Sequence, residues 1–242
     1  MRICSEHFVA LAYPQGDCWS GFLAYTPDKL EALIEFGNEF MTDQDGNSML
    51  SIILGNFLPP AQASGILAVV FHNGPREQGE KVFKPLLDLR PVSKTIETLP
   101  YTEVNLMFNK HPRGPRDRPL FGGANFTLPL APERAREIGD FFWKETNDTE
   151  QAAFRSSTMT LEYHTANAIR KVGVEDTAVG FKGDAYSDGS GSYLNNFSNV
   201  TRAEKVYGPN AARLRKLKRK YDPAFVFKKN IDLSSGPMNG EH

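Results

Sequence analysis

Residues 193–229, YLNNFSNVTRAEKVYGPNAARLRKLKRKYDPAFVFKK, carry the most informative run of motifs in this 242-residue sequence. Gly208-Pro209 predicts the start of a helix, because the missing N–H of a proline costs little in the first helical turn. Asp222-Pro223 predicts its end, since the residue before a proline is disfavoured in the α region. Helical spacing predicts one buried face on this helix, formed by Ala211, Leu214, Leu217 and Tyr221.

The order of the motifs in this segment resembles that of a known family. Y-L-N is followed by Y-G-x-N, then by L-x-x-L-K-x-K-Y-D-P, then by V-F. This order is similar to the carboxyl-terminal signature of the berberine-bridge-enzyme-like FAD-linked oxidases of the vanillyl-alcohol-oxidase superfamily. Further pieces lie upstream in the family's order, at residues 12–14, 19–21, 83–87 and 161–164. The resemblance extends over residues 8 to 233.

The predicted fold class is α+β, with an antiparallel sheet covered by helices on one face and a carboxyl-terminal helical segment. Strands and helices alternate without the glycine turns of a parallel nucleotide-binding sheet, which favours antiparallel pairing. Strands are predicted over residues 5–13, 19–25, 48–54, 66–72, 120–128 and 157–164, and helices over 29–41, 77–87 and 132–143.

The resemblance implies two regions in the chain. Residues 1–186 correspond to the family's substrate domain, and within them residues 1–18 correspond to the crossing from the flavin domain. Residues 187–242 correspond to the berberine-bridge-type segment, after a Ser/Gly/Asp linker at 187–192.

The composition excludes several classes of protein. With 40% apolar residues, 24% charged residues and a formal net charge of −1, the chain is globular and has no global field favouring nucleic acid or a membrane surface. No signal-peptide core or membrane span opens the sequence, so we expect a cytoplasmic protein, and a secretory one only if a leader is missing. Cys4 and Cys18 have no metal-ligand spacing; free thiols are favoured over one disulfide, and no metal is expected.

The cofactor that the resemblance implies is FAD, yet nothing in this sequence matches the family's amino-terminal FAD-binding domain. The glycines of residues 121–125 open no helix, so they are a poor phosphate cradle. An evolutionary loss and a gene-model error both remain open as explanations. Without the flavin domain, an apolar surface loses its expected partner, and we expect a homodimer or a partner chain to cover it; its residues are Phe8, Tyr193, Phe197, Phe225 and Phe227.

Two pairs of residues are candidates for a functional site. Tyr193 and Asn195 match the family's Y-x-N motif, and the resemblance makes them candidate cofactor contacts; the competing interpretation is an Asn-rich turn. Glu162 and His164 share one face of a predicted strand and form a candidate acid/base pair. The favoured alternative for this second pair is a polar, solvent-facing side of the strand.

Six cations lie within the eight residues 213–220. They could bind a phosphate group, but a solvated helix face is the favoured interpretation. No stacking aromatic residues are interleaved with the cations, and the chain as a whole is not basic.

Three hypotheses on function follow. In the first, the chain is or derives from an FAD-linked oxidoreductase that oxidises a small specialised metabolite by hydride transfer to the flavin. In the second, it is a flavin-free relative that binds a metabolite and acts as a cyclase or isomerase, or as a subunit of a partner. In the third, it is a non-functional truncation product.

Overall fold

The computed structural model describes residues 16–42, 46–60, 62–110, 126–148, 154–163, 165, 171–178, 203–227 and 231–234. These fall into two compact units. Within the described ranges, the first unit comprises residues 16–110 and 131–163, and the second comprises 126–130 and the residues from 165 onward. The predicted strand over residues 5–13 and the predicted boundary at residue 186 lie outside the described residues.

The first unit is built on a five-stranded sheet of order β4-β1-β3-β2-β5. Every neighbouring pair is antiparallel, which confirms the predicted fold class. The strands are β1 (Asp17–Tyr25), β2 (Ser48–Leu58), β3 (Ala63–His72), β4 (Ser93–Pro100) and β5 (Met159–Tyr163). The sequence did not predict β4, because this edge strand, SKTIETLP, buries only Leu99 and shows no apolar alternation.

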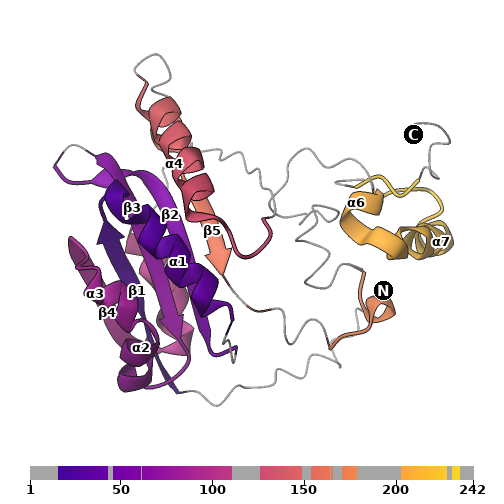
Figure 1. Cartoon of the computed structure of the whole chain (residues 1–242). Helices are drawn as coiled ribbons and strands as arrows, with labels where there is room; N and C mark the ends of the chain where they lie inside the picture. Colours follow the sequence, from indigo (N-terminus) through magenta and orange to yellow (C-terminus); the bar gives the residue numbers. More distant parts are fainter. Residues whose placement is uncertain are drawn as a thin grey trace. The chain divides into compact units, whose positions relative to one another are not determined.

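Helices cover one face of this sheet (Figure 1). They are α1 (Leu30–Phe40), α2 (Arg76–Val82), α3 (Lys84–Asp88) and α4 (Pro132–Asn147), with a 3₁₀ turn η2 (Pro27–Lys29) leading into α1. The face beneath them is apolar and buried; it includes Leu23, Tyr25, Leu50, Ile52, Leu54, Ile66, Ala68 and Val70. The predicted stripe of α1 is confirmed, with buried side chains from Leu30, Leu33, Ile34, Phe36 and Phe40.

The single helix predicted over residues 77–87 was wrong. Two short helices form instead, and Phe83 lies between them with non-helical dihedrals of −97° and 14°. Pro85 then occupies the first turn of α3, where its missing N–H is tolerated. The break places the Phe83 ring in the core, 5.8 Å from the ring of Trp19 and 5.5 Å from that of Phe40.

On the opposite face of the sheet, the first unit contributes the 3₁₀ segment η3 (Tyr101–Lys110). The Phe108 ring contacts Phe22 edge-on at 5.5 Å, and the Tyr101 ring contacts Phe71 at 6.3 Å. Phe22 and Phe71 alternate with the helix-facing residues of β1 and β3, so η3 marks the second face of the sheet.

The second unit contains η5 (Val174–Asp176), α6 (Ala203–Tyr207), η8 (Gly208–Asn210) and α7 (Ala211–Tyr221). Its core is a small cluster of Ala203, Val206, Ala211 and Ile231. The buried Asn210 side chain donates hydrogen bonds to the carbonyl oxygens of Val174 (2.6 Å) and Thr177 (3.0 Å) and so joins η5 to the helices.

The helix limits predicted for this unit are confirmed, whereas its predicted buried face is confirmed at Ala211 but not at Leu217 or Tyr221. Pro209 lies in the first turn of η8, and α7 ends at Tyr221, before Asp222. Leu217 and Tyr221 are 39% and 73% exposed, whereas Arg215 is buried. The predicted strand over 120–128 is also absent from its described residues, 126–128, which have no strand partner.

The approach of α1 to β5 allows no side chain at Gly37. A Cβ atom there would lie 2.6 Å from the Cζ atom of the buried Tyr163 ring. Gly37→Ala should therefore destabilise the chain by about 1–3 kcal/mol, although alanine normally stabilises an exposed helix interior relative to glycine by about 1 kcal/mol. Denaturant unfolding measures this change.

The control is the same substitution in a Tyr163→Leu background, where the ring is gone. There, Gly37→Ala should cost less, and the double-mutant cycle should give a coupling of about 0.5–3 kcal/mol. Stabilisation of the otherwise unchanged chain by Gly37→Ala would contradict the close approach.

Candidate functional site

The candidate site is the sheet face opposite the helices. β5 alternates as predicted: Met159, Leu161 and Tyr163 share the helix side, and Thr160 and Glu162 lie on the other. Glu162 is exposed and stands directly across from Ser51 of β2, and Thr160 stands across from Ile53. A carboxylate at this edge can accept hydrogen bonds or a proton from a bound molecule.

The middle of this face is apolar. Val69 and Phe71 of β3 and Phe22 of β1 share it with Glu162, because residues paired across antiparallel strands point to the same side. Ser20, on the same face, donates its hydroxyl to the carbonyl oxygen of Val70 at 2.8 Å, so its polarity is satisfied internally. The Phe108 and Tyr101 rings of η3 pack on Phe22 and Phe71, and Val69 is buried, so the exposed Glu162 carboxylate borders an apolar surface that η3 partly covers.

Three of the four predicted site residues lie outside the described residues. They are His164, Tyr193 and Asn195. The pairing of Glu162 with His164 and the cofactor contacts of Tyr193 and Asn195 therefore stay predictions.

Two other ionisable side chains of the first unit have packing roles. Burial raises the pKa of Tyr163 to about 12, so this phenol on the helix side is neutral at ordinary pH. Cys18 is a buried free thiol, with its Sγ 3.7 Å from Oδ1 of Asn73. Burial, and secondarily the nearby Asp17, raise the pKa of Cys18, which keeps it from acting as a thiolate nucleophile.

The described residues include no cluster of three or more His, Cys, Asp or Glu side chains that could hold a metal ion. No helix in the same ranges is long and apolar enough to cross a membrane.

Lys218 and Asp222, the K-x-x-x-D pair of the carboxyl-terminal motif, stabilise a turn. Asp222 accepts a hydrogen bond from Lys218 Nζ at 2.5 Å and from the backbone N–H groups of Val226 (2.8 Å) and Phe227 (3.1 Å). Lys218 also donates to the carbonyl oxygen of Phe227 and lies 5.8 Å from the centre of the Phe225 ring. The turn leaves Val226 and Phe227 70% and 74% exposed.

Three of the six clustered cations have partners within the second unit. Arg215 is buried against Glu204, with 2.6 Å between Nη1 and Oε1, and Lys218 is held by Asp222. Arg213 donates to the carbonyl oxygen of Glu175 at 2.6 Å. Lys216, Arg219 and Lys220 are exposed, as expected for a solvated helix face. The buried Arg215 departs from that expectation, because it occupies a position where the spacing predicted no core residue.

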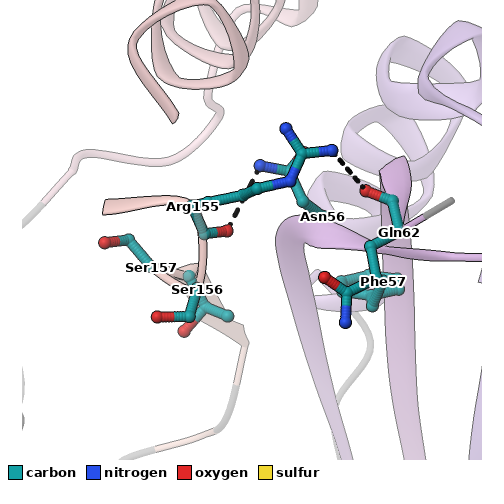
Figure 2. A pocket seen from close by; sticks show the side chains of 7 residues that line it. Asn56, Phe57, Gln62, Arg155, Ser156 and Ser157 are labelled. Atoms are coloured by element: carbon teal, nitrogen blue, oxygen red, sulfur yellow. Dashed lines mark hydrogen bonds between the residues drawn. The ribbon is translucent and has the colours of Figure 1, made fainter. Parts of the chain in front are cut away.

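Sequence analysis missed a second candidate, a hollow beside the start of β5 (Figure 2). It is lined by Asn56, Phe57 and Gln62 and by residues 155–158. The run Arg155-Ser-Ser-Thr158 offered a signal, since one cation followed by three hydroxyls is a polar run beside a predicted strand.

Comparison with known proteins supports the family resemblance. The family model described as berberine and berberine like matches residues 189–231, which include the motif turn at Asp222. Two curated proteins, both named FAD-linked oxidoreductase pgmH, from Aspergillus terreus (strain NIH 2624 / FGSC A1156) and Aspergillus terreus, are 22% and 21% identical over 90% of this chain. The match to this family model is confined to the carboxyl-terminal segment.

The chain spans about half the length of the curated relatives it matches, 55% and 54% respectively. A crystal structure of the VAO-type flavoprotein MtVAO615 from Myceliophthora thermophila C1 matches with a TM-score of 0.47 and 17% identity, covering 86% of this chain and 46% of that one.

The described residues do not fit the pyrophosphate of FAD. A pyrophosphate is bound by a glycine-rich turn at a helix start. The three longest described helices, α1, α4 and α7, instead follow Lys29, Ala131 and Asn210. Arg213, Arg215 and Lys218 are held by groups of their own unit. FAD contact by this chain would have to come from residues outside the described ranges.

The Asp222 turn should depend on pH. The hydrogen bond from Lys218, then those from the Val226 and Phe227 amides, lower the pKa of Asp222 from its ordinary value. A lowered pKa in the folded state stabilises the turn above the unfolded pKa of about 3.9 and loses this effect as pH falls through the folded pKa. The NMR shifts of the Val226 and Phe227 amides should be constant from neutral pH down to about pH 5 and change with a midpoint below 3.9.

Asp222→Asn is the matched control, because it keeps the shape and removes the titrating group. Its amide shifts should show no such transition while the circular dichroism stays native. A midpoint at or above the ordinary carboxyl value in the unchanged chain would contradict the role of Lys218.

Proposed function

We propose that this chain forms the substrate-side part of an FAD-linked oxidoreductase acting on a small organic metabolite of specialised metabolism. The observation that carries the proposal is the sheet face opposite the helices, where the exposed Glu162 borders the apolar Phe22, Val69 and Phe71, partly covered by η3. The names of the relatives, which are FAD-linked oxidoreductases, support the class of reaction.

In this proposal, the residues of the chain bind the substrate and handle its proton. Phe22 and Phe71 hold the apolar body of the metabolite against the sheet. Oxidation of an alcohol or amine removes a hydride and a proton, and Glu162 accepts the proton at one of its carboxylate oxygens. FAD is the electron acceptor expected from the relatives, held by residues outside the described ranges or by another polypeptide.

A second candidate function is metabolite binding without flavin, with cyclase, isomerase or subunit roles. The misfit of the described residues to a pyrophosphate favours it. In this case, a second copy or a partner chain covers the exposed side chains of Tyr221, Val226 and Phe227.

Gel filtration after incubation with FAD separates the two candidates. Flavin absorbance that elutes with the chain in a 1:1 ratio would show that the chain holds the cofactor itself, and would contradict the flavin-free candidate. If the chain elutes without flavin as a homodimer and converts a metabolite in that state with no electron acceptor present, the oxidoreductase proposal fails. Flavin retained only in a complex with a second polypeptide supports the substrate-side role.

Glu162→Gln tests the proton acceptor in the flavin-containing preparation. Because the amide cannot take a proton, kcat/KM should fall by about 10²- to 10⁴-fold. Glu97→Gln is the matched control: Glu97 lies on the same face but on β4, at the opposite edge of the sheet, and its substitution should leave kcat/KM within about twofold. Equal losses in the two variants would remove the special role of Glu162.

A further inference from the structure

The hollow at the start of β5 is a separate site of about 320 Å³. All of its lining residues belong to the first unit. Its volume is at the small end of the range for ligand pockets, which suits a small molecule or one functional group of a larger one.

Diverging strands create this hollow. The pairing of β5 with β2 stops at Leu54 and Met159, and the pairing of β2 with β3 is irregular between Asn56 and Leu58. Gly55 lets the chain bend back tightly, because a Cβ atom there would lie 2.8 Å from the ring of Phe57. The Phe57 ring therefore rests over the backbone of Gly55 and forms the apolar part of the lining.

Asn56 fixes the polar wall. Its Nδ2 donates to Oγ1 of Thr146 at 3.1 Å and to the carbonyl oxygen of Arg155 at 3.3 Å. Its Oδ1 accepts from the hydroxyl of Ser64 at 3.0 Å. One amide thus joins α4, β3 and the turn at residues 154–158, so the turn is held in place without a ligand.

Arg155 brings positive charge to the hollow (Figure 2). Its Nη2 donates to the carbonyl oxygen of Gln62 at 3.4 Å, and its Nη1 donates to Oδ1 of Asn147 at 3.3 Å. These two bonds are long and their acceptors are neutral, and Arg155 also takes part in a further interaction. Bonds from a guanidinium to an oxyanion are shorter and about twice as strong, so an anion can compete for these donors.

The rest of the lining also favours an anion. Ser156, Ser157 and Thr158 supply three hydroxyl groups, none of which makes a side-chain hydrogen bond to another described residue. No carboxylate lines the hollow among the described residues. Hydroxyls and a guanidinium donate hydrogen bonds, and the Phe57 ring offers a surface for an organic group.

We propose that this hollow binds the oxyanion group of a small organic molecule, a carboxylate or a phosphate. Arg155 provides the charged contact, the hydroxyls of Ser157 and Thr158 provide further donors, and Phe57 packs against the organic part. The site does not depend on flavin or on Glu162, so it stands whether or not the oxidoreductase proposal holds.

NMR titration of the ¹⁵N-labelled full chain tests the site, with inorganic phosphate and sodium benzoate added separately at constant ionic strength. Saturable shifts should appear at the backbone amides of Gln62 and residues 155–158. Saturation by phosphate alone identifies a phosphate group as the ligand, and saturation by benzoate alone identifies an aromatic carboxylate. Shifts that stay linear, or that spread evenly over charged surface residues, for both anions would overturn the proposal.

Arg155→Gln should weaken the binding of the saturating anion by at least about tenfold, as expected for losing a charged hydrogen-bond partner. Arg134→Gln is the matched control, because Arg134 makes an exposed ion pair with Glu137 at 2.7 Å on α4, outside the hollow. The control should bind as the unchanged chain does. Equal binding by Arg155→Gln and the unchanged chain would overturn the proposal.

A second variant keeps the test decisive if Arg155→Gln loses its native spectrum. Ser157→Ala combined with Thr158→Val removes two donors and keeps the positive charge. Anion binding should then weaken several-fold, and unchanged binding would count against the site.

Discussion

The packing of α1 against the sheet and against α4 is the constraint on which the first unit depends. At one point, α1 presents Gly37 to the buried ring of Tyr163; at another, the Leu30 side chain lies so close to Gly139 of α4 that a Cβ atom there would be 2.7 Å from it. Both contacts are possible only because the residue at each point is a glycine, which has no side chain. They fix β5 at the edge of the sheet and α4 over β2, and β5 in turn decides which way Glu162 faces.

The two faces of the sheet have different roles, because the described α-helices of the first unit cover only one of them. Side chains that point toward the helices are almost completely buried and contribute to stability, as Leu50, Ile66 and Val70 do. The other face keeps Glu162 accessible beside apolar side chains. Because side chains alternate along a strand, both roles come from the same five strands, and a shift of register by one residue would exchange them.

The second unit uses charged residues to build structure. Asp222 accepts hydrogen bonds from Lys218 and from two backbone N–H groups, and Arg215 is buried against Glu204. A carboxylate that accepts several hydrogen bonds fixes a turn more firmly than a neutral side chain does. The turn therefore explains why the motif contains Lys218 and Asp222. The same turn leaves the side chains of Val226 and Phe227 exposed.

The sequence by itself determined the fold class, the stripe of α1, the alternation of β5 and the limits of α7, because each depends on local periodicity or on a proline. It also predicted that Thr160 and Glu162 share a face, opposite to Leu161 and Tyr163. Only the tertiary structure decided the polar edge strand β4, the break at Phe83, the burial of Arg215 and the hollow around Arg155. These features depend on which residues distant in sequence pack together, and hydrophobic spacing along one segment carries no information about partners in another.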